Sequence, residues 1–175
     1  MKVAELKKHL ASSSKEDLIK QAIELFQKNN FVKDYYNLKY DPEEKLALLD
    51  KYKTAVTNEF FPKRGFGKAR LSVAKKSISE FKKLVPDPKQ IIEIMLHYVE
   101  IGVDFTNAYG DIDGNFYMSM EGMYEQVVQL IVKEERVDEF YDRCYDVVTN
   151  TSDIGWGFHD GLSSTFYEYF GNEND

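Results

Sequence analysis

The chain has 175 residues, of which 43% are hydrophobic and 30% are charged. These proportions exclude a disordered chain, and no apolar run approaches the about 20 residues that a membrane-spanning helix needs. The length predicts a single domain over residues 1–175 with a hydrophobic core. The single cysteine and an N-terminus without an apolar signal core predict a cytoplasmic protein.

The net charge of −7 conceals two halves of opposite sign. Residues 1–85 contain 19 Lys and Arg and 11 Asp and Glu, a net of +8, whereas residues 86–175 contain 4 and 19, a net of −15. The basic half suits an anionic partner such as nucleic acid. The two halves equally suit attraction to each other, within one molecule or between two copies. We favour attraction between halves, because nucleic-acid-binding proteins usually lack so acidic a second half.

Apolar residues at helical spacing predict helices over 3–10, from Ser13 to about residue 29, over 31–40 and over 42–60. Ser13 and Glu16 form a predicted capping box for the second helix. Asp41 is the predicted N-cap of the fourth helix, with a proline next to it at the first helical position.

The first two of these helices contain KVAELKKHL and SKEDLIKQAIEL. The pair resembles the SAP motif, a two-helix DNA-binding module, although the linker here is several residues shorter and lacks the usual glycine. The resemblance implies DNA binding by this segment. The alternative is an ordinary helical hairpin.

A glycine-rich basic loop, PKRGFGKAR, covers residues 62–70 and precedes another predicted helix. Its glycines could bring backbone N–H groups close to an anion that basic side chains surround. The candidate anion-binding residues are Lys63, Arg64, Gly65, Gly67, Lys68 and Arg70. The glycine spacing does not fit a P-loop. The alternative is a turn whose glycines permit positive φ, followed by a solvated basic helix.

Residues 88–107, PKQIIEIMLHYVEIGVDFTN, are predicted to form the central helix, because nearly every position outside one narrow polar stripe is apolar. Asp87 is the predicted N-cap. The candidate site residues on the stripe are Glu93, His97, Glu100 and Asp104. Their three- and four-residue spacing lets neighbouring side chains meet, as metal ligation would require. We expect instead a solvent-facing edge of a mostly buried helix.

Further helices are predicted over 116–135, 137–148 and 162–170, and the final residues GNEND are expected to fray. Cys144 lies on an apolar helix face and is predicted to be a buried structural thiol. Before the last helix, the segment Gly-Trp-Gly-Phe-His-Asp contains the candidate residues Trp156, His159 and Asp160. His159 could act as a base near neutral pH. The structural alternative is that Trp156 and Phe158 plug the end of a helical stack.

The stretches YGDIDGNFYMSMEGMYEQ and TSDIGWGFHDGLSSTFYEYF resemble an uncharacterised family of small bacterial all-helical proteins, with the best match over residues 98–170. This resemblance implies an intracellular bacterial protein of a domain-of-unknown-function family. It implies no activity and no catalytic residues.

The predicted fold is all-α, with eight or nine helices in antiparallel hairpins that form an irregular bundle or a short α-solenoid-like stack. We predict a protein-interaction or scaffold domain, because 12 Tyr and 12 Phe exceed what such a core readily hides. A homodimer between basic and acidic halves is one version. We expect no cofactor, no bound metal and no membrane partner.

Two alternative functions stay open. The first is binding of nucleic acid or a phosphorylated ligand through the basic segment 63–83, which also contains Lys75 and Lys76. The second is a metal-assisted enzyme that uses the polar stripe of the central helix or His159.

Overall fold

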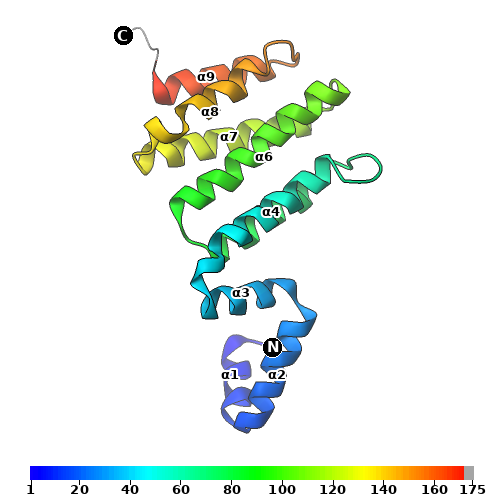
Figure 1. Cartoon of the computed structure of the whole chain (residues 1–175), viewed down its shortest axis with the longest axis vertical. Coiled ribbons are helices and arrows are strands. Elements are labelled where there is room, and N and C mark those ends of the chain that lie inside the picture. Colours follow the sequence, from blue (N-terminus) through cyan, green and yellow to red (C-terminus); the bar gives the residue numbers. More distant parts are fainter. Residues whose placement is uncertain (172–175) are drawn as a thin grey trace. The chain divides into compact units, whose positions relative to one another are not determined.

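The computed structural model describes residues 1–171, and within this range the chain forms nine α-helices, one 3-10 helix and no strand (Figure 1). The predicted all-α class is therefore confirmed. In chain order the elements are α1 (Val3–Ala11), α2 (Lys15–Lys28), α3 (Asn30–Tyr40), η1 (Pro42–Glu44), α4 (Lys45–Phe60), α5 (Leu71–Leu84), α6 (Pro88–Tyr109), α7 (Gly114–Lys133), α8 (Val137–Thr149) and α9 (Phe158–Phe170).

Several predicted helix ends are confirmed, and two are wrong. The Asp87 side chain accepts a hydrogen bond from the Gln90 backbone N–H, as predicted for the cap of the central helix. Ser14, not Ser13, caps α2 by accepting from the Asp17 N–H. Helix α9 begins at Phe158, four residues earlier than predicted. Of the predicted frayed tail, residues 172–175 lie outside the described residues.

The chain divides into two compact units, residues 1–45 and residues 46–175, each with its own internal contacts. We call them unit 1 and unit 2 and describe each by itself. The prediction of a single domain over residues 1–175 stays a prediction.

Unit 1 consists of α1, α2, α3 and η1, with α2 packed against α3. Helices α1 and α2 contain no buried residue, and Asp34 is the buried residue of α3. The apolar face of α2 is therefore largely open. Its members Leu18, Ile19 and Ile23 are exposed, and Ile23 keeps 51% of its surface accessible. Unit 1 thus has little hydrophobic core of its own.

Unit 2 is built around α6, the predicted central helix. In Figure 1, α6 and α7 run antiparallel to each other, as do α8 and α9, and the Tyr52 ring of α4 packs against the Phe81 ring of α5 at 5.7 Å. Helix α6 packs against α5, α7 and α8, while α7 also packs against α8 and α9. The buried face of α6 includes Ile92, Leu96 and Val99, which are fully shielded from solvent. Unit 2 is therefore an irregular bundle around one mostly buried helix.

Helices α6 and α7 are in close contact at Gly102. A Cβ atom at this position would lie 2.3 Å from the sulfur of Met120, which is itself fully buried. Near this point the Phe60 ring from α4 meets the rings of Tyr98 and Phe105 edge-on, at centroid distances of 5.9 and 5.7 Å. Aromatic packing thereby joins α4 to the central helix.

Candidate functional site

The polar stripe of α6 is a solvent-facing edge, as the sequence predicts, only at Asp104, whereas Glu93, His97 and Glu100 are partly covered. Side chains from α4 and α8 cover these three residues, and the Glu93 side chain keeps only 22% of its surface accessible. The covering residues are Lys53 and Thr57 from α4 and Arg143 from α8. The apolar face of α6 is buried as predicted. On its polar face, Glu93, His97 and Glu100 contact side chains of α4 and α8.

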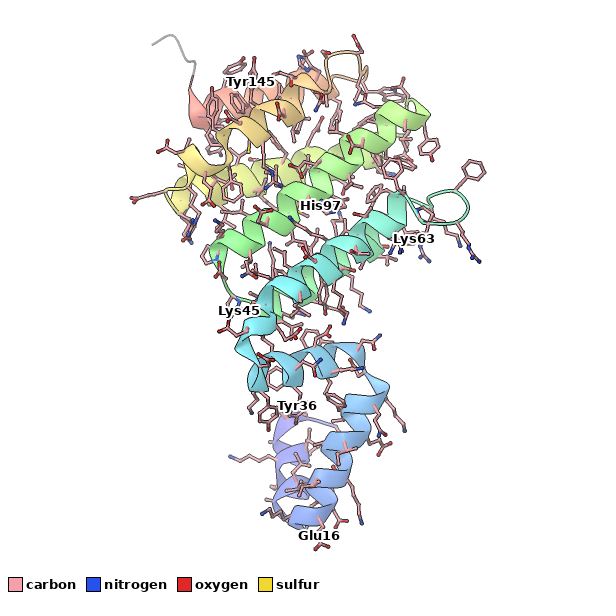
Figure 2. All side chains as sticks on the ribbon, in the orientation of Figure 1. Glu16, Tyr36, Lys45, Lys63, His97 and Tyr145 are labelled. Atoms are coloured by element: carbon pink, nitrogen blue, oxygen red, sulfur yellow. The ribbon has the colours of Figure 1, made fainter. Side chains whose placement is uncertain are left out.

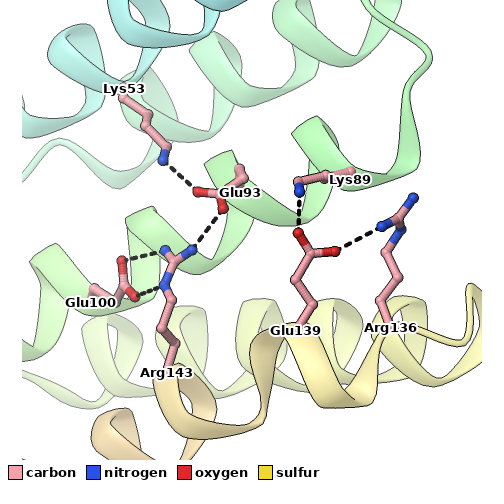
Figure 3. Close-up of polar contacts among 7 residues, drawn as sticks. All are labelled: Lys53, Lys89, Glu93, Glu100, Arg136, Glu139 and Arg143. Atoms are coloured by element: carbon pink, nitrogen blue, oxygen red, sulfur yellow. Dashed lines mark hydrogen bonds and ion pairs between the residues drawn. The ribbon is translucent and has the colours of Figure 1, made fainter.

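Arg143 links two carboxylates of the stripe, as Figure 3 shows. Its Nε and Nη2 donate to the two oxygens of Glu100 at 2.9 and 3.0 Å, and its Nη1 donates to Glu93 at 2.9 Å. The other Glu93 oxygen accepts from Lys53 Nζ at 2.6 Å. We call these four residues, Lys53, Glu93, Glu100 and Arg143, the charge clamp. It connects α4, α6 and α8 by charge-assisted hydrogen bonds.

The hydrogen bonds of the charge clamp occupy the carboxylate oxygens of Glu93 and Glu100 that could otherwise bind a metal ion. Burial raises the pKa of Glu93, but hydrogen bonds and attraction from Lys53 and Arg143 outweigh it and lower the pKa below the usual value. All four carboxylate oxygens of Glu93 and Glu100 accept hydrogen bonds from cationic side chains. Among the described residues, no group of three or more His, Cys, Asp and Glu could hold a metal ion. The arrangement supports a structural role for the predicted stripe.

His97, between the two glutamates, is half-buried and lies 2.8 Å from the Thr57 hydroxyl through Nε2. Burial lowers the pKa of His97, and the nearby positive charge of Lys53 lowers it further. Asp104 is exposed at the rim of a small pocket of about 190 Å³. Glu100, Arg143 and Asp146 line this pocket as well, but neither Trp156 nor His159 does. The stripe and the tryptophan segment therefore do not share it.

His159 caps the end of α8. Its Nδ1 lies 3.2 Å from the Val148 carbonyl oxygen and 3.1 Å from the Thr151 hydroxyl. Because a carbonyl only accepts hydrogen bonds, Nδ1 carries the proton and donates, which leaves Nε2 facing Ser163 at 3.4 Å. The ring thus satisfies a helix-terminal carbonyl, which argues for a structural role over the predicted base.

The alternative that Trp156 and Phe158 plug the end of a helical stack agrees with the burial of Phe158 but not with the exposure of Trp156. Phe158 is fully buried and packs against the Tyr117 ring at 4.8 Å, but Trp156 keeps 69% of its surface accessible. Trp156 also adopts a positive φ of 65°, in the turn that leads into α9. Asp160 is exposed in the first turn of α9. The segment forms the turn between α8 and α9 and the start of α9.

The predicted anion-binding loop exposes all four of its basic side chains, of which Lys63, Arg64 and Lys68 are three. The fourth, Arg70, is bound to Glu59 by two hydrogen bonds of 2.7 and 2.8 Å. Phe66, which the sequence reasoning missed, stands at the loop with 85% of its surface accessible. Its position between two glycines was the signal that could have identified it.

Unit 1 contains a second feature that the sequence reasoning missed, a groove of about 580 Å³. The Phe26 and Tyr36 rings meet edge-on at 6.3 Å, and Tyr36 stacks on Tyr40 at 6.2 Å (Figure 2 labels Tyr36). We call this feature the unit 1 groove. It is lined by Ala22, Ile23, Phe26, Tyr36, Asn37, Tyr40, Asp41 and Glu44.

Cys144 is buried, as predicted. Its backbone carbonyl accepts a hydrogen bond from the Tyr124 hydroxyl at 2.9 Å. Burial raises the pKa of the thiol to about 12. Such a thiol is protonated and unreactive at neutral pH, which fits a structural residue.

Neither the curated proteins nor the solved structures contain a match. Among the described residues, the helices are all too short or too polar to cross a lipid bilayer. The family comparison matches residues 1–170 to a family of unknown function, DUF6155. The predicted resemblance to an uncharacterised family is thereby confirmed, and it extends beyond residues 98–170 to nearly the whole chain. The chain belongs to the DUF6155 family.

Proposed function

We propose that the chain is a protein-interaction domain and that the unit 1 groove is its docking surface. The observation that supports this is the absence of any buried residue in α1 and α2, although both helices carry large apolar side chains. Exposed members include Val3, Ile19 and Leu25. Scattered apolar residues are common on surfaces, but a continuous apolar face with an aromatic groove is typical of an interface.

The size of unit 1 favours the same proposal. Domains of roughly 40 residues bury too little surface to be stable without disulfides, metals or association. Unit 1 has 45 residues and no cysteine. A partner that covered Ile23 and Tyr40 would add the apolar burial that the unit lacks.

The proposed occupant is helix α1 of a second copy of the chain. Helix α1 exposes Val3 and Leu6, and Lys7 and Lys8 stand beside them. The unit 1 groove offers aromatic rings with Asp41 and Glu44 at its edge. Apolar and charged groups are therefore complementary, and a two-fold symmetric pair would use each contact twice.

The variant Ile23→Ser/Tyr40→Ser tests the proposal by size-exclusion chromatography with light scattering. The wild-type chain is expected to dimerise in the micromolar range at both low and high salt, because salt does not screen apolar contacts. The variant is expected to be monomeric. Met118→Ser/Tyr167→Ser, at exposed positions of α7 and α9, is the matched control and is expected to dimerise.

Two results would contradict the proposal. A wild-type chain that stays monomeric at every concentration has no such interface. A dimer that dissociates as salt is added, and that the groove variant leaves intact, would instead indicate attraction between the basic and acidic halves.

A further inference from the structure

The loop of residues 62–70 presents an aromatic side chain among positive charges, on a surface separate from the unit 1 groove. Phe66 extends into solvent, and Lys63, Arg64 and Lys68 surround it without an ion pair among the described residues. Figure 2 shows the loop extending beyond the end of α4, next to the label of Lys63. We propose that this loop, together with the exposed face of α5, binds single-stranded nucleic acid.

The loop is anchored at its C-terminal side, so that it presents Phe66 in a defined position. The Ala69 N–H donates to the Glu59 carbonyl oxygen at 2.8 Å, and the Arg70 guanidinium donates two hydrogen bonds to the Glu59 carboxylate. Gly67 lies so close to the end of α4 that a Cβ would be 1.7 Å from the Phe60 carbonyl oxygen. A pre-formed loop loses less conformational entropy on binding than a mobile one.

The positive charge continues along α5. Lys75, Lys76 and Lys83 are exposed on this helix, and Glu80 is the one acidic residue between positions 63 and 83. Fourteen helical residues span about 21 Å. The loop and helix together could therefore contact several successive phosphates, while the acidic residues of α6 to α9 disfavour binding elsewhere.

Unpaired bases fit this surface better than a duplex or a membrane. Single-stranded nucleic acid binds to positive surfaces through its phosphates and stacks its bases on aromatic rings. A duplex leaves no base face free for Phe66. A membrane would require more apolar area than one side chain flanked by glycines. A pocket of about 210 Å³ beside Phe66 also presents the Asn58 amide, which could bond a base edge.

Fluorescence anisotropy of the full chain with a labelled 12-nucleotide oligo(dT), oligo(U) or matching duplex tests the proposal. The single strands are expected to bind and the duplex to bind less tightly, and the two strands show whether DNA or RNA is preferred. Phe66→Leu should weaken binding about tenfold, whereas Phe66→Trp should preserve it, because stacking needs an aromatic face. Lys63→Glu/Arg64→Glu/Lys68→Glu should abolish tight binding and reduce the slope of log K against log salt by about 2.

Lys15→Glu/Lys20→Glu/Lys28→Glu is the matched control, with the same change of charge on exposed residues of α2. It should bind like the wild type. Loss of binding in this control, but not in the loop variant, would place the site in the SAP-like hairpin and overturn the proposal. No binding of either strand at low salt, or binding of anionic phospholipid vesicles without any oligonucleotide, would overturn it too.

Discussion

His97 shows how a single side chain in unit 2 makes stability depend on pH. It lies on α6 near Lys53 and Arg143, between Glu93 and Glu100 on the polar stripe. Burial and the two positive charges lower its pKa below the ordinary value of 6.5, against the opposing effect of Glu100. The folded state therefore resists protonation of His97, whereas the unfolded chain accepts the proton as pH falls through 6.5.

We expect the free energy of unfolding to decrease as pH falls below 6.5, and His97→Gln to reduce this decrease. Glu93 contributes in a lower window, because its lowered pKa gives stability that is lost only as pH falls below its ordinary value of 4.5. Urea unfolding at several pH values from 7.5 to about 5.5 measures the contribution of His97 alone, because this range lies above the pH window of Glu93. His9→Gln, on the exposed helix α1, is the matched control. A pH dependence unchanged by His97→Gln would contradict this account.

The roles of some residues could be predicted from sequence, whereas those of others could not. The Asp87 cap and the burial of Cys144 follow from local spacing along one helix, and both predictions are confirmed. The bonds of His159 and Arg143 depend on which helices face each other, which no local pattern contains. Arg143 did offer one signal, since it is one of only four basic residues after position 85.

At the scale of helices, the charge clamp fixes how α4, α6 and α8 meet. Apolar packing alone permits helices to slide, because its attraction is not directional. The guanidinium of Arg143 instead binds two carboxylates about two helical turns apart, and Glu93 and Glu100 supply them from a single face of α6. Burial would lower the pKa of Arg143, but both carboxylates outweigh it and raise the pKa. The central helix was predictable from its own pattern, but the neighbours of its polar stripe were not.

Arg143→Gln is expected to destabilise unit 2 by about 1–3 kcal/mol, because half-buried carboxylates lose their partner. Arg143→Lys should be intermediate, since lysine keeps the charge but loses the paired bonds to Glu100. Thermal and urea unfolding measure both effects. In a double-mutant cycle, Glu100→Gln should add little to Arg143→Gln. Full additivity would contradict a direct coupling. Arg136→Lys, at the exposed pair with Glu139, is the control and should change little.

At the scale of the whole molecule, the chain combines a well-packed unit with a poorly packed one. Unit 2 buries ten residues of α6 and eight of α7, whereas α1 and α2 of unit 1 bury no residue. The sequence predicted helices in both units equally well. It did not distinguish the two degrees of burial, because an amphipathic helix has the same pattern whether its apolar face meets its own chain or a partner.

Hydrogen–deuterium exchange of the wild-type chain at low and high protein concentration tests the proposed docking surface most directly. At low concentration, amides of α2 and α3 are expected to exchange faster than those of α6, because unit 1 has little core. At high concentration, exchange in α1, α2 and α3 should slow, while exchange in α6 to α9 stays the same. Exchange in unit 1 that does not depend on concentration, or slowing confined to α6 to α9, would contradict the proposal.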